Sequence, residues 1–198
     1  MEIVEENSEL YPPLLWEVGG APEKLFVLGK SNLLTEKMVV VVGSRLVSNR
    51  GRMNARKVVK RLVNEGYVVV SGLARGVDTE VHRECLRLGG KTVAVLAHGL
   101  DWVYPQENIG LAKEILEKGG ALVSQLEKGI RPEKYFFPLR NRLMVGMSLG
   151  VVVVEAGLRS GTMTTANWAG ELGRQVWVVK GSVGTDLLSR EGASEWVF

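Results

Sequence analysis

The sequence contains a single cysteine, Cys85, and only two histidines among its 198 residues. One thiol excludes both a disulfide framework and a cysteine-based zinc cluster, and it fits a reducing compartment. We expect Cys85 to be a small buried apolar residue. His82 and His98 have no neighbouring residues in a ligand pattern, so we expect no metal site.

Long hydrophobic runs are also missing. No apolar run reaches the length of a membrane span. The first six residues are acidic, whereas the start of a secretory signal peptide is basic. We therefore expect a cytoplasmic protein. The sequence has no internal repeat or low-complexity tract, and its 45% hydrophobic content excludes a disordered chain.

Charge is modest but unevenly distributed. The formal net charge of +3 does not indicate a polyanionic partner by itself. Residues 1–36 contain seven glutamates and two lysines, whereas residues 37–75 contain nine basic side chains and one glutamate. Arg52, Arg56 and Lys60 lie four residues apart, on one face of an expected helix, and such faces are usually solvated. The positive field lies beside the first two expected strand ends, where it would attract an anion.

Short apolar runs recur at regular intervals and predict strands that are buried on both faces. They are Met38–Val42, Tyr67–Val70, Thr92–Leu96, Gly150–Val154, Gln175–Val179 and a weaker sixth, Ala121–Val123. Helical patterns cover Met53–Asn64, Asp78–Leu88, Ile109–Lys118, Pro138–Leu149 and Thr164–Leu172, with a shorter one at Thr185–Glu191. This alternation predicts an α/β fold, a Rossmann-like open sheet that is mostly parallel with helices on both faces.

The N-terminal residues 1–36 do not follow this alternation. Tyr11–Leu15 is broken by two prolines, and Ala21–Lys30 contains one short strand pattern. We expect residues 1–36 to be a lead-in that docks on a main domain formed by residues 37–198. No linker composition separates the two.

Two expected strands end in glycine, hydroxyl and arginine residues. One is followed by Gly43-Ser44-Arg45, and the next by Ser71-Gly72-Leu73-Ala74-Arg75-Gly76. Ligands of parallel sheets bind at such ends, because free backbone N–H groups and helix N-termini point outward there. The spacing matches neither a dinucleotide fingerprint nor a Walker loop. The two arginines favour a phosphate ligand, and the alternative is a pair of tight turns with solvated arginines.

Two later segments have related chemistry. Ser160-Gly161-Thr162 forms a third hydroxyl-rich turn at a helix start, for which simple helix capping is the alternative. Arg131–Arg142 interleaves basic and aromatic side chains, a pattern that holds single-stranded nucleic acid. The alternative is that Phe136 and Phe137 anchor the next helix in the core. Together the segments favour one ligand groove across the carboxyl edge of the sheet.

In this order, the segments resemble the DNA processing protein A family, also called DprA or Smf. The resemblance covers nearly the whole chain. Its main motifs are Gly43-Ser44-Arg45, Ser71–Asp78, Phe137–Arg142, Ser160-Gly161-Thr162 and Glu171–Arg174.

This resemblance implies sequence-independent binding of single-stranded DNA, without a cofactor and without a bond made or broken. It also implies a homodimer that helps to load the RecA recombinase in DNA recombination, during natural transformation of competent cells. The residues expected to bind DNA phosphates are Gly43, Ser44, Arg45, Ser71, Gly72, Arg75, Gly76, Lys134, Arg140, Asn141, Arg142, Ser160, Gly161 and Thr162.

The chain departs from the family pattern in several places. Ala97 stands where glycine is usual, Lys180-Gly181 replaces Pro-Gly, and Asp186 replaces an asparagine. We expect one wall of the groove to be shortened there. The N-terminal helical domain and the C-terminal winged helix of many members do not fit in 198 residues.

The main rival is an enzyme related to the nucleotide phosphoribohydrolases once labelled lysine decarboxylases. Arg140 and Ser160-Gly161-Thr162 match part of their pattern, but Thr165 stands where those enzymes need a carboxylate. Glu155 and Asp101 are the remaining candidate acids. A small nucleotide or second-messenger sensor is the third interpretation.

Overall fold

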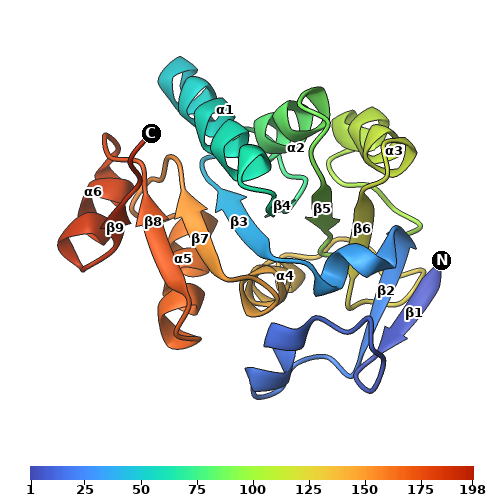
Figure 1. Cartoon of the computed structure of the whole chain (residues 1–198). Helices are drawn as coiled ribbons and strands as arrows, with labels where there is room; N and C mark the ends of the chain where they lie inside the picture. The colour runs from blue at the N-terminus through green and yellow to red at the C-terminus, as the bar shows by residue number, and fades with distance from the viewer.

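The valine-rich runs form the centre of a nine-stranded sheet in the computed structural model, which describes all 198 residues (Figure 1). The strand order is β1-β2-β6-β5-β4-β3-β7-β8-β9. The bounds are β1 Glu2–Glu5, β2 Lys24–Gly29, β3 Met38–Val42, β4 Val68–Ser71, β5 Thr92–Val95, β6 Ala121–Ser124, β7 Gly150–Val153, β8 Gln175–Val178 and β9 Ser194–Glu195. All neighbouring pairs among β3 to β9 are parallel, whereas β1 pairs with β2 and β2 pairs with β6 in the antiparallel direction. The predicted mostly parallel α/β sheet is confirmed.

Helices cover both faces of this sheet (Figure 1). The α-helices are α1 Asn49–Asn64, α2 Val77–Arg87, α3 Ile109–Glu117, α4 Phe136–Gly146, α5 Gly161–Glu171 and α6 Val183–Arg190. Three short 3-10 helices are η1 Pro13–Glu17, η2 Ser31–Thr35 and η3 Gln106–Asn108. Helices α1, α2 and α3 lie on one face, and α4 and α5 lie on the other (Figure 1).

Strand β3 shows how the sequence builds two cores at once. Val39 and Val41 pack with α1 and α2, whereas Val40 and Val42 join the core on the opposite face. Alternate side chains of a strand point to opposite faces, so a continuous apolar run fits a strand covered on both sides. Cys85 is buried in the core beneath α1 and α2, as expected.

The lead-in belongs to the same sheet as the rest of the chain. Strand β2 confirms the predicted strand and pairs with β6, and β1 adds an unpredicted strand at the edge. Tyr11 and Leu25 are buried in the larger core, and the Tyr11 hydroxyl donates to the carbonyl of Pro22 at 2.7 Å. Residues 1–36 therefore share both sheet and core with residues 37–198.

Some element boundaries differ from the predictions. Helix α1 begins at Asn49 rather than Met53, because Ser48 caps it: its Oγ accepts from the Gly51 N–H at 3.0 Å. Strand β9 has only two residues and was not predicted. No helix combines the length and the apolar composition needed to cross a bilayer.

Candidate nucleic-acid interface

The loops after β3 and β4 form one rigid unit at the carboxyl edge of the sheet. The Val77 N–H donates to the Ser44 carbonyl at 3.1 Å. Gly76 has φ +76°, and a Cβ at this position would overlap the Ser44 carbonyl oxygen. Only glycine fits both the backbone conformation and this close approach. The parallel pairing of β3 and β4 thus places Ser44 and Arg45 beside the loop that contains Arg75.

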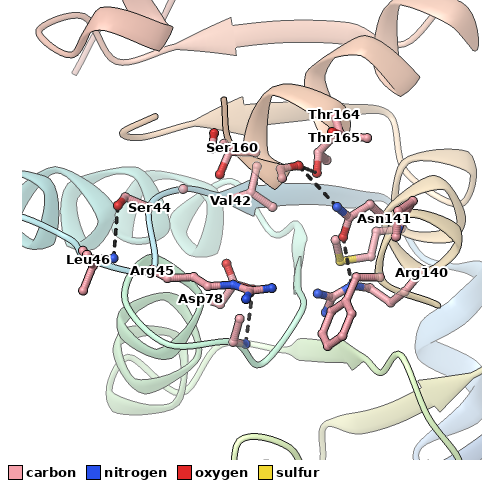
Figure 2. Close-up of a pocket in the computed structure, with 17 residues that line it drawn as sticks. Val42, Ser44, Arg45, Leu46, Asp78, Arg140, Asn141, Ser160, Thr164 and Thr165 are labelled. Carbon is pink, nitrogen blue, oxygen red and sulfur yellow. Dashed lines mark hydrogen bonds between the residues drawn. The ribbon is translucent and has the colours of Figure 1, made fainter. Parts of the chain in front are cut away.

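A cleft of about 430 Å³ opens next to these loops (Figure 2). It lies between the loop after β3, the start of α2, and the first turns of α4 and α5. The predicted site residues that line it are Gly43, Ser44, Arg45, Arg140, Asn141, Ser160, Gly161 and Thr162. Four separate chain segments therefore meet in one cleft.

An aromatic ring flanked by two guanidinium groups stands in this cleft. The Phe137 ring centroid lies 5.3 Å from the Arg45 guanidinium and 5.9 Å from that of Arg140. Both arginines reach into the cleft from opposite sides in Figure 2. Tyr104, which is half-exposed, meets the same ring edge-on at 6.2 Å. Cations near a ring face add to its attraction for stacked, negatively charged ligands.

The two arginines differ in exposure and in hydrogen bonding. Arg45 is exposed, whereas Arg140 forms part of the cleft floor and has only 5% of its surface exposed. The Arg140 guanidinium donates to the carbonyls of Gly72 and Val95, the latter at 2.9 Å, and to Asn141 Oδ1 at 2.9 Å. Burial lowers its pKa to about 10, partly offset by the Asp78 carboxylate. The group remains charged at neutral pH and ties the ends of β4 and β5 to α4.

Asp78 supports the second loop from inside the first turn of α2. Its carboxylate accepts from the N–H groups of Gly72 at 3.1 Å and Ala74 at 3.3 Å. Gly76, and not Asp78, occupies the N-cap position of α2. Burial raises the pKa of Asp78, and Arg140 acts in the opposite direction.

Gly72 and Arg75 line a small adjoining cavity of about 60 Å³, together with Ala97, His98 and Tyr104. Arg75 is held there by Glu107, with Nε–Oε1 and Nη2–Oε2 distances of 3.0 and 2.8 Å. A phosphate that uses Arg75 has to share it with this carboxylate or displace it.

The remaining predicted residues lie outside both cavities. Ser71 is fully buried, and its hydroxyl donates to the Val41 carbonyl at 2.8 Å. Arg142 donates to the carbonyls of Gly19 and Gly20 in the lead-in and lies over the Trp168 ring. Lys134 is exposed two residues before the start of α4. Phosphate contact by each of these side chains stays a prediction.

Several residues near the cleft were not among the sequence candidates. Thr164 and Thr165 line it because they follow Gly161 by about one helical turn, a spacing visible in the sequence. Met144 lines it one turn after Arg140 on α4. The basic face of α1 is engaged elsewhere: Arg52 and Arg56 form ion pairs with Glu80 at 2.5 and 3.0 Å.

The segment Lys180–Asp186 does not line the cleft. Asp186 Oδ1 accepts from the Gly181 N–H at 3.0 Å, and the Ser182 hydroxyl accepts from the Ala156 N–H at 3.0 Å. This turn is therefore closed on itself and fastened to the end of β7.

A sequence model of the family described as DNA recombination-mediator protein A matches residues 2–197. The chain belongs to this family. Protein Smf of Escherichia coli is 42% identical over 182 residues, which are 92% of this chain and 49% of that protein. The chain thus spans about half the length of such curated relatives. The family resemblance drawn from the motifs is confirmed.

Solved structures of two relatives have the same fold. The X-ray structure of DNA processing protein A from Streptococcus pneumoniae superposes with a TM-score of 0.92 at 40% identity, covering 98% of this chain and 70% of that one. The family member from Helicobacter pylori superposes with a TM-score of 0.88 at 27% identity, covering 98% and 91%. That structure describes the single-stranded DNA binding mode of the Helicobacter pylori protein.

Proposed function

We propose that this chain binds single-stranded DNA in the cleft and acts as a DNA recombination mediator. The observation that supports this most directly is the Phe137 ring, which lies near the guanidiniums of both Arg45 and Arg140. Such a site stacks a base on the ring while cations neutralise the phosphates beside it. The DNA binding described for the Helicobacter pylori relative supports the same function.

Each side of the cleft has a separate role in this proposal. Ser44 and the exposed Arg45 contact one phosphate. The start of α5 receives another through Ser160, Gly161 and Thr162, because the first N–H groups of a helix have no intrahelical acceptors. A ring face accepts every base, so the binding does not depend on sequence.

The other predicted residues contact DNA at the edges of the cleft or hold the surrounding loops and helices in place. Arg75 and Lys134 contact the strand where it leaves the cleft. Gly72, Gly76 and Ser71 shape the loop, while Asn141 links α4 to α5 by donating to the Gly161 carbonyl at 3.4 Å. Arg142 holds the lead-in against α5.

We further infer a binding function without bond-making or a cofactor. Asp78 is the one acidic residue that lines the cleft, and two backbone N–H groups occupy its carboxylate. Glu155 and Asp101, the other acids considered for catalysis, do not line it. Release of free base from nucleoside monophosphates would favour the phosphoribohydrolase function instead.

Family membership supports three additional parts of the proposal. The chain acts in the cytoplasm, as a homodimer, and it helps to load the RecA recombinase onto DNA. Co-sedimentation of RecA with the protein on single-stranded DNA tests the last part.

The decisive experiment is a titration of fluorescent oligo-dT at several salt concentrations. We expect Arg45→Ala to weaken binding about tenfold or more, and to reduce the slope of log affinity against log salt by about 0.7, the value for one phosphate contact on a single strand. Arg83→Ala is the matched control, because Arg83 is exposed on α2 and does not line the cleft. Unchanged affinity in both Arg45→Ala and Phe137→Ala would contradict the proposal.

A further inference from the structure

Glu155, the second residue after β7, contacts the loop that contains Arg45 at both of its ends. Its backbone carbonyl accepts from the Ser44 N–H at 2.8 Å. Its side chain reaches Ser48 at the other end: Oε1 accepts from the Ser48 N–H at 3.1 Å, and Oε2 accepts from the Ser48 hydroxyl. One residue that follows a neighbouring strand thus fixes both the beginning and the end of this loop.

The Glu155 carboxylate lies behind the loop and outside the cleft lining. A Cβ at Gly51 would overlap Glu155 Oε2, so the first turn of α1 packs directly on the carboxylate. Ser48 in turn caps α1 through the Gly51 N–H. The carboxylate therefore connects the end of β7, the loop 43–48 and the start of α1.

A negative charge in this position is unfavourable for a site that attracts phosphates. Electrostatics alone therefore predicts tighter DNA binding when the charge is removed. The hydrogen bonds predict the opposite when the reach of the side chain is shortened, because Arg45 lies within the short loop between the two fixed points, Ser44 and Ser48.

We propose that Glu155 is a positioning residue for phosphate binding, which holds the loop 43–48 so that Arg45 faces Phe137 across the cleft. This inference rests on the proposed single-stranded DNA binding. Glu155 itself touches no ligand. Its size and hydrogen bonding determine its role, and its charge does not.

Two substitutions separate size from charge. Glu155→Asp keeps the charge but is one methylene too short to reach Ser48, whereas Glu155→Gln keeps the length and removes the charge. We expect Glu155→Asp to weaken oligo-dT binding about fivefold to tenfold, the effect of losing one or two hydrogen bonds that order a loop. Glu155→Gln should bind within about threefold of the unchanged protein, or tighter, because an amide can still bond to Ser48.

The matched control is Glu171→Gln, which removes one exposed negative charge at the far end of α5. Normal binding by Glu155→Asp would overturn the inference. Equal weakening by Glu155→Asp and Glu155→Gln would overturn it as well.

Two additional measurements distinguish this inference from the proposed function. In an Arg45→Ala background, Glu155→Asp should change the oligo-dT affinity little further. A full additional loss of affinity would show that Glu155 does not act through Arg45. Amide hydrogen exchange without DNA should be faster at Ser48 in Glu155→Asp, because the Ser48 N–H loses its side-chain acceptor. If the unchanged protein does not bind oligo-dT, the proposed function fails, whereas failure of the Glu155 variants alone overturns only the positioning role.

Discussion

At the scale of single residues, the Phe137 ring provides the sharpest test of the cleft. The ring is held near two guanidiniums and stays partly exposed. We expect Phe137→Ala to weaken oligo-dT binding by about 1–3 kcal/mol, the usual contribution of one stacked base. Phe137→Tyr keeps the ring and should bind nearly normally in the same anisotropy assay. Equal affinities of the alanine and tyrosine variants would argue against stacking.

The ion pair between Arg75 and Glu107 predicts a substitution that strengthens DNA binding. Glu107 competes with phosphate for the Arg75 guanidinium, and both side chains are more than half exposed. Glu107→Gln should tighten binding and steepen its salt dependence by about 0.7, because one more cation becomes available to the strand. Glu127→Gln is the control, since it breaks an exposed pair with Lys24 in the lead-in, away from the cleft. Weaker binding by Glu107→Gln would mean that Glu107 orients Arg75 productively.

Residue type and position predicted which loops gather at the cleft, but they did not predict how each side chain points. Arg140 and Arg142 belong to one motif and lie two residues apart on α4, so they face different directions. Arg140 forms the cleft floor, whereas Arg142 binds carbonyls of the lead-in. The orientation depends on where the lead-in packs, and residues 1–36 show no pattern that fixes this in the sequence.

At the scale of elements, continuous apolar runs made the central strands predictable, while the edge strands gave little signal. Strand β1 has one buried residue, Val4, among three exposed ones, and β9 has only two residues. Their pairing depends on β2 and β8, which are distant in sequence. Long-range pairing of this kind overrides weak local preference.

The pairing of β2 with β6 predicts that the lead-in is required for folding. A chain starting at Lys37 would lose β2, expose the edge of β6 and lose the buried Leu25, Leu33 and Leu34. Each large apolar side chain contributes about 1.5–3 kcal/mol on burial, and a domain has only about 5–15 kcal/mol in total. We expect this truncation to be unfolded or aggregated by circular dichroism and size-exclusion chromatography.

A shorter truncation provides the control. Removal of residues 1–7 eliminates β1 but leaves β2 in place, and Val4 is the one buried residue of β1. This chain should fold and melt only a few degrees lower, because a loss of about 1 kcal/mol shifts the melting temperature of a domain of this size by roughly 2–4 °C. A cooperatively folded chain from residue 37 would mean that residues 37–198 form an independent domain.

At the scale of the whole molecule, the cleft is built over ionisable groups that are buried in the interior. His82 on α2 is fully buried, and its Nδ1 lies 2.8 Å from the Thr92 hydroxyl. That hydroxyl donates to the Val69 carbonyl, so the hydrogen-bond network assigns the imidazole proton to Nδ1. Nε2 has no hydrogen-bond partner. A second proton there would be buried without an acceptor and within the field of Arg140.

Burial, and to a lesser extent Arg140, lowers the pKa of His82 from 6.5 to about 3. The folded protein therefore holds His82 neutral, and its contribution to stability is complete above pH 6.5 and is lost as the pH falls toward 3. We expect the free energy of unfolding to include a His82 contribution that declines by about 1.4 kcal/mol per pH unit in this range. Asp78 acts in the opposite direction, because burial raises its pKa.

Urea unfolding of the unchanged protein and of His82→Gln between pH 7.5 and 4.5 isolates this contribution. Asp78 is present in both proteins, so the difference between their unfolding free energies reports mainly the titration of His82. Glutamine cannot take up the proton, and it therefore removes the pH-dependent part while retaining a polar group near Thr92. The substitution should lower the free energy of unfolding more at pH 7.5 than at pH 4.5. A difference that stays constant across this range would show that His82 titrates alike in the folded and unfolded chains, and that the interior beneath the cleft is open to water.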